Sequence, residues 1–115
     1  YFGLGINEYN SHIYPVNINV LEYGSNKGIF IFESYDIESR SLKVIQKGFV
    51  DLPVSSVESF IAGNTIYIGE GNALSTTPST VSGSWVRSMG VCVPNKENTI
   101  VRIWFDPDST YILLV

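Results

Sequence analysis

Apolar and polar residues alternate along much of the chain, and this alternation predicts β-strands. In residues 16–21, Val16, Ile18 and Val20 share one face, and asparagines occupy the other. A period of two is typical of a strand that buries one side. Because Pro15 cannot donate a hydrogen bond to a strand ladder, we expect this strand to begin at Val16 or to lie at a sheet edge.

Six further segments are rich in β-branched and aromatic residues, which favour strands. They are residues 29–35, 41–51, 65–69, 85–93, 99–105 and 111–115. Gly48 interrupts the alternation in the second of these segments and predicts a β-bulge. In residues 99–105 both faces are apolar apart from Arg102, which indicates burial on two sides. Such burial fits either the central strand of a monomer or a strand at a subunit interface.

One segment has the periodicity of a helix instead. Residues 53–63 place Val54, Val57 and Ile61 on one face, and Gly63 is suited to the end of a helix. Together the elements predict an all-β fold, a small β-sandwich or barrel of about seven strands with one short helix.

The composition agrees with a single β-domain spanning residues 1–115. The chain has 13 Ile and 12 Val against 2 Ala, and its length is sufficient for one hydrophobic core. It begins with Tyr1 and not with methionine, which favours a fragment of a longer protein or a processed product. The composition changes near residues 36–40, so the first 35 residues are interpreted as a separate subelement packed against the rest.

The charge pattern argues against two classes of partner. The net charge is −4, and the 7 Lys and Arg residues are scattered between Lys27 and Arg102. Binding to nucleic-acid phosphates requires clustered cations, so no nucleic-acid partner is expected. The apolar run at residues 111–115 is far shorter than a membrane span of roughly 18 residues, so no membrane insertion is expected.

Few residues are candidates for catalysis or metal binding. His12 is the only histidine, and no nucleophile or acid is singled out beside it. Asp106 and Asp108 flank Pro107 and could bind calcium or act as an acid–base pair. A turn in which the carboxylates accept hydrogen bonds from nearby backbone amides is the favoured interpretation.

The other polar candidates also have simple structural explanations. Glu33, Asp36 and Glu38 form a second acidic group, interpreted as a solvated turn, and residues 69–71 lack the lysine of a phosphate loop. The single cysteine, Cys92, is expected to be a small buried hydrophobic residue and not a reactive thiol. We therefore predict that the chain is not an enzyme and has no catalytic residue, metal site or cofactor.

Aromatic residues offer a different kind of chemistry. Trp85 and Trp104 could form a platform for stacking sugar rings, but tryptophans on strands are more often core or interface residues, which is the favoured interpretation. Six tyrosines are suited to interfaces without defining a site: Tyr9, Tyr14, Tyr23, Tyr35, Tyr67 and Tyr111.

Residues 42–105 contain a series of short motifs in a definite order. They are a glycine-containing strand at 44–50, a segment ending in Ala62 and Gly63, a strand at 63–68, a turn with hydroxyl residues and Pro78 at 71–78, a strand with Trp85 and Gly90 at 84–91, and a strand at 99–105. In this order and spacing, the stretch resembles the small C-terminal β-domain of tailed-phage tail-fibre, head-fibre and capsid decoration proteins. Residues 1–40 carry no such resemblance and are therefore interpreted as a family-specific subelement.

The resemblance implies a bacteriophage structural protein located in the virion, and extracellular after release. The expected role is that of the C-terminal domain of a homotrimeric fibre or tail fibre, which forms trimers and attaches to a host-surface receptor, either a glycan or a protein. Two alternatives are a capsid decoration or head-fibre module, and a non-catalytic carbohydrate-binding appendage of a phage depolymerase. Because a rigid β scaffold presents its loops for recognition, residues 70–83 and 94–98 are the candidate receptor-binding segments, with no single contact residue predicted.

Overall fold

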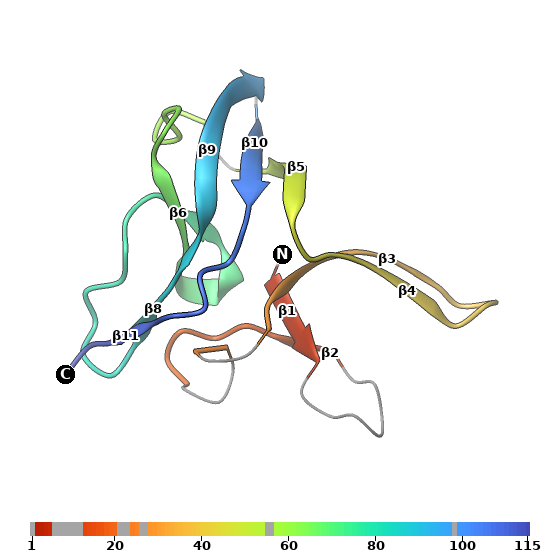
Figure 1. Cartoon of the computed structure of the whole chain (residues 1–115), viewed down its shortest axis with the longest axis horizontal. Helices are drawn as coiled ribbons and strands as arrows, with labels where there is room; N and C mark the ends of the chain where they lie inside the picture. Colours follow the sequence, from red (N-terminus) through yellow and green to blue (C-terminus); the bar gives the residue numbers. More distant parts are fainter. Residues whose placement is uncertain (1, 6–12, 21–23, 26–27, 55–56, 98) are drawn as a thin grey trace.

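Strands form the framework of the fold in the computed structural model (Figure 1), which describes residues 2–5, 13–20, 24–25, 28–54, 57–97 and 99–115. The strands are β1 (Phe2–Gly5), β2 (Ile13–Pro15), β3 (Phe30–Asp36), β4 (Ser41–Ile45), β5 (Gly48–Pro53), β6 (Thr65–Ile68), β7 (Leu74–Ser75), β8 (Trp85–Val86), β9 (Ser88–Glu97), β10 (Ile100–Phe105) and β11 (Ile112–Leu113). A short 3-10 helix, η2, spans Glu70–Asn72. The predicted all-β class is confirmed, with more and shorter strands than expected.

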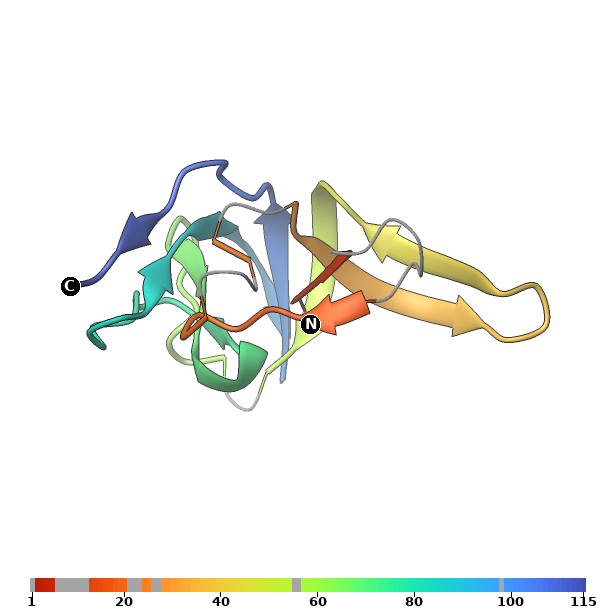
Figure 2. The same ribbon diagram turned by 90° about the horizontal axis from the view of Figure 1, so that it is seen from below.

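The strands are arranged in three antiparallel sheets. One has the order β2-β1-β3-β4, and a second has the order β5-β10-β9-β6-β7 and curls into half a barrel. The small third sheet pairs β11 with β8. Figures 1 and 2 show that the β3–β4 hairpin extends away from the rest of the molecule, on the side opposite the C-terminus.

The predicted strand does not begin at Val16, but the alternative position at a sheet edge is found, because β2 with Pro15 is the edge strand of its sheet. Strand β2 ends at Pro15, and a turn follows in which the Val20 amide donates to the carbonyl oxygen of Asn17 at 3.2 Å. Val16 and Ile18 are nevertheless buried, and Asn17 and Asn19, which alternate with them, are exposed. The alternation thus predicts which side chains face the core, but the chain satisfies it in an irregular segment.

The segments predicted at 41–51 and 85–93 are each divided between two sheets. A bend at residues 46–47 separates β4 from β5, and Gly48 begins β5 with a φ of 134°. Arg87 separates β8 from β9. The turn predicted at 94–98 is also wrong for its described part, because β9 continues to Glu97.

The helix predicted at residues 53–63 is not formed by the described part of that segment. Turns occur there instead, with the Phe60 amide donating to Val57 at 3.1 Å and the Asn64 amide donating to Ile61 at 3.0 Å. Phe60 is buried, whereas Ile61 is 59% exposed. A helix of about two turns is not stable by itself, so burial of Phe60 decides the local conformation.

One hydrophobic core unites the first 35 residues with the rest of the chain. Buried residues from both parts form a single cluster, in which the rings of Phe2 and Phe105 lie with centroids 6.0 Å apart. Asn72 adds a polar connection, since its side-chain oxygen accepts from the Phe2 amide at 3.1 Å and its side-chain nitrogen donates to the Phe2 carbonyl at 2.7 Å. Residues 1–40 are therefore integrated into the fold through their described part.

In the described ranges, no helix has the length and apolar character required to cross a membrane.

Candidate binding surfaces

Strand β10 has one buried face and one open face. Val101, Ile103 and Phe105 are fully buried, whereas Ile100 on the opposite face is 49% exposed and Trp104 is partly exposed. The expected burial on both sides is thus not achieved within one copy of the chain. In a single copy of the chain, the apolar side chains of this second face are therefore partly exposed to solvent.

An apolar stripe crosses this open face over three strands. Phe49 on β5 and Val91 on β9 both pair in register with Trp104 on β10. The rings of Phe49 and Trp104 meet edge to face with centroids 4.8 Å apart, yet the Phe49 side chain is 65% exposed and Val91 is 38% exposed. We refer to Phe49, Val91 and Trp104 as the outer stripe.

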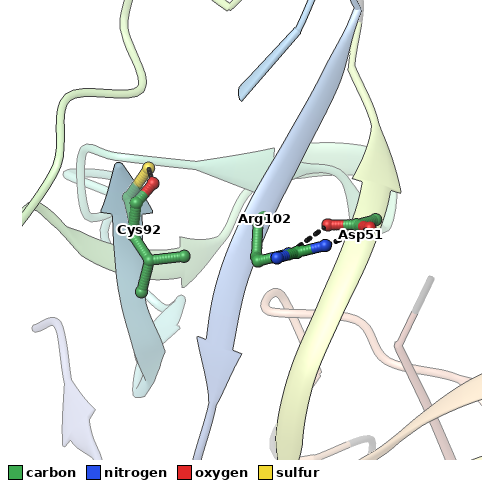
Figure 3. Close-up of polar contacts among 4 residues, drawn as sticks. Asp51, Cys92 and Arg102 are labelled. Atoms are coloured by element: carbon green, nitrogen blue, oxygen red, sulfur yellow. Dashed lines mark hydrogen bonds and ion pairs between the residues drawn. The ribbon is translucent and has the colours of Figure 1, made fainter. Parts of the chain in front are cut away.

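An ion pair borders the outer stripe. Arg102 on β10 donates two hydrogen bonds to the carboxylate of Asp51 on the neighbouring β5, at 2.8 and 3.1 Å (Figure 3). The hydrogen bond from Arg102 lowers the pKa of the Asp51 carboxyl, and the same bond raises the pKa of the Arg102 guanidinium. The two charges therefore compensate each other on the sheet surface.

The β3–β4 hairpin is a second open apolar surface. We refer to residues 30–45 as the arm. Its exposed apolar side chains are Phe32 at 46%, Tyr35 at 54%, Ile37 at 79% and Leu42 at 39%. Its connecting turn is stabilised by Asp36, whose carboxylate accepts from the Glu38 amide at 3.0 Å.

A groove of about 380 Å³ lies between the C-terminal segment and the strands β6, β8 and β9. Its lining combines two tyrosine rings with hydroxyl groups, one carboxylate and aliphatic side chains: Tyr67, Pro78, Ser79, Val86, Arg87, Ser88, Asp108, Thr110, Tyr111, Ile112 and Leu114. Arg87 is one of these lining residues. Its guanidinium is held in place because it donates to the carbonyl oxygen of Gly24 at 2.8 Å and to that of Asp108. Burial lowers the pKa of the Arg87 guanidinium.

The acidic candidates are explained by local structure. The Asp108 carboxylate accepts from the amide and the hydroxyl of Thr110, both at 3.1 Å, and these bonds lower its pKa. Asp106 is 3.8 Å from Lys47, and Glu33 is 3.6 Å from Lys43 across the arm. The described residues contain no cluster of three or more metal-ligating side chains.

Trp85 and Cys92 are buried in the hydrophobic core, whereas Trp104 is partly exposed. Trp85 is 1% exposed in the core, so it cannot form a common sugar platform with Trp104. Cys92 is buried, as predicted, with its thiol 3.7 Å from the Val93 carbonyl oxygen (Figure 3). His12 lies outside the described residues. Of the predicted loops, residues 70–83 contribute Pro78 and Ser79 to the groove.

The groove and the arm were not predicted from the sequence. Tyr67 and Tyr111 were noted only as interface-prone, and 44 residues separate them in the chain. Comparison of the chain with family models, with curated proteins and with solved structures gives no significant match.

Proposed function

We propose that this chain is a non-enzymatic structural domain of a tailed-phage virion, the C-terminal domain of a homotrimeric fibre or tail fibre. Its role would be to join copies of the chain and to attach the virion to a host-surface receptor. The resemblance of residues 42–105 to such domains supports this proposal. The observation that carries it is the presence of two open apolar surfaces, the outer stripe and the arm, because contiguous exposed apolar surface marks interaction sites.

The first test is the mass of the purified chain by light scattering across a range of concentrations. We expect a species of three chains at micromolar concentration, because trimer formation covers apolar surface that the monomer exposes. A chain that stays monomeric throughout this range would contradict the assembly role.

Binding assays separate the fibre proposal from a capsid decoration or head-fibre module. A receptor-binding fibre domain is expected to bind bacterial cells, whereas a decoration module is expected to bind emptied capsids and no cells. Binding to capsids alone would favour the decoration function.

The groove favours a second candidate function, binding of a saccharide without catalysis. Tyrosine rings can contact the apolar face of a sugar, and the Asp108 carboxylate and nearby hydroxyls can bind its hydroxyl groups. This chemistry is compatible with a glycan receptor for a fibre and with a carbohydrate-binding appendage of a depolymerase.

Replacing Tyr111 tests the saccharide function. Tyr111→Ala removes a ring that is 41% exposed in the groove, so we expect about tenfold weaker binding to any glycan recognised on a bacterial glycan array. Tyr111→Phe keeps the ring and serves as the matched control. Unchanged binding by Tyr111→Ala would remove the groove as the saccharide site.

A further inference from the structure

The arm has one apolar face and one polar face, as its strand pairing shows. Phe32 lies opposite Val44, and Tyr35 lies opposite Leu42. Directly opposed residues of two antiparallel strands project to the same side. Phe32 and Tyr35 are three positions apart and would face opposite sides of a regular strand.

A bulge in β3 brings these pairs to the same face. The register shifts between Phe32 and Ser34, where β3 has one more residue than β4. This extra residue restores the side on which Tyr35 projects, so all four apolar residues share one face. The opposite face carries the Glu33–Lys43 ion pair and Ser34.

The apolar face of the arm requires a cover. An isolated two-stranded hairpin is marginally stable in water without packing on one side. Among the strands of the described residues, β3 pairs only with β4 beyond Ile31, and Phe32 and Tyr35 remain about half exposed, at 46% and 54%. The arm therefore has the apolar residues of a hairpin that packs on another surface, but these residues are partly exposed to solvent.

The chain exposes more surface than a compact monomer of its size. Its accessible surface is 7143 Å², whereas a compact monomer of 12.8 kDa is expected to expose about 6300 Å². The projecting arm contributes to this excess (Figure 1), and such an excess is expected of a single subunit taken from an assembly.

We propose that the apolar face of the arm in one copy packs on the outer stripe of a second copy. Each copy carries both surfaces, and both are apolar, aromatic and exposed. The Asp51–Arg102 pair beside the stripe is already compensated, so covering it leaves neither charge of the pair alone. Because the two contacting surfaces are different, the contact is heterologous, and it closes into a ring only with the rotation of the trimer proposed above. This inference rests on the self-association proposed above.

Two variants remove one surface each. Tyr35→Glu places a charge on the arm, and Phe49→Glu places a charge on the stripe, at side chains 54% and 65% exposed. Each is expected to weaken self-association about tenfold or more, measured by light scattering over a dilution series. Val81→Glu is the matched control, because Val81 is 51% exposed in the loop between β7 and β8, outside the arm, the outer stripe and the groove, and it should leave assembly unchanged.

Mixing the two variants tests the heterologous contact itself. Tyr35→Glu retains an intact stripe and Phe49→Glu retains an intact arm, so an equimolar mixture is expected to form a heterodimer that cannot close into a ring. A mixture that remains monomeric would overturn the arm-on-stripe contact. Near-ultraviolet circular dichroism verifies folding, and Tyr35→Ser with Phe49→Ser replaces any glutamate variant that unfolds.

The outcomes distinguish this inference from the proposed function. Wild-type assembly that both glutamate variants retain would overturn the arm-on-stripe contact and leave the assembly role intact. A wild-type chain that is monomeric at all concentrations would overturn both.

Discussion

Gly90→Ala is expected to destabilise the chain by about 4 kcal/mol, a large part of the stability of a small domain. Gly90 lies on β9 opposite Phe105, with a φ of 141° that side chains rarely adopt. A Cβ atom at this position would lie 1.8 Å from the Trp104 carbonyl oxygen and 3.2 Å from the Asp106 amide nitrogen. Both obstacles are backbone atoms, so a change of side-chain rotamer cannot relieve the clash.

Urea unfolding followed by tryptophan fluorescence measures this effect. Gly63→Ala is the matched control, because Gly63 also has a positive φ, 90°, but has open space where the Cβ would be placed. Only backbone strain of about 1 kcal/mol is expected there. Equal losses in the two variants would show that the close approach at Gly90 is unimportant.

Trp85→Ala is the second substitution with a large expected effect, about 4 kcal/mol. Trp85 is 1% exposed, and its indole N–H donates to the carbonyl oxygens of Asn17 at 2.9 Å and Val20 at 3.0 Å. Its ring also lies against Gly24, where an added Cβ would be 2.9 Å away. Removal of the ring leaves a cavity and takes one hydrogen-bond donor from each of the two carbonyl groups, of which that of Asn17 keeps the Val20 amide as a donor.

Trp85→Phe separates these two contributions. It retains much of the ring but removes the N–H, so we expect a loss of about 2 kcal/mol. Trp104→Phe is the control on the open face and should cost less than about 1 kcal/mol in the monomer. Both are best measured in the Tyr35→Glu background, so that self-association does not contribute. Similar losses for Trp85→Ala and Trp104→Phe would contradict the assignment of Trp85 to the core.

Local residue patterns predict the faces of this fold better than its strand limits. Val16 and Ile18 alternate with asparagines and are buried as expected, although their segment is a turn. Gly90 lies in the strand predicted at residues 85–93, and its missing Cβ allows the close backbone approach found in the structure. These features depend on side-chain period and on the absence of a Cβ, which are visible in the sequence.

The errors arise where distant contacts decide the conformation. Gly48 was interpreted as a bulge within one strand, but the chain there passes from one sheet into another. Arg87 interrupts a predicted strand because its side chain binds the carbonyl oxygens of Gly24 and Asp108. Neither event can be inferred from neighbouring residues, since the partners are remote in the chain.

The binding surfaces were only partly predictable. The apolar second face of β10 was visible in the alternation of residues 99–105, and it contributes Trp104 to the outer stripe, next to Phe49 on β5. The apolar face of the arm could not be predicted, because Phe32 and Tyr35 lie on the same face only as a result of the bulge between them. A bulge without glycine has no local sequence signal, so regular alternation assigns these two rings to opposite sides.

The arm also has two open edges within the part of the chain that the structure describes. There, β3 has a hydrogen-bonded neighbour on one side only from Phe32 onward, and β4 is the last strand of its sheet. Unpaired strand edges are templates for uncontrolled strand addition and aggregation. Glu33 and Lys43 lie on the polar face of the arm, and further charged residues lie in its turn. These charges oppose strand addition between unassembled copies. The same hairpin that offers an apolar face to a partner thus carries the charges that discourage the wrong kind of contact.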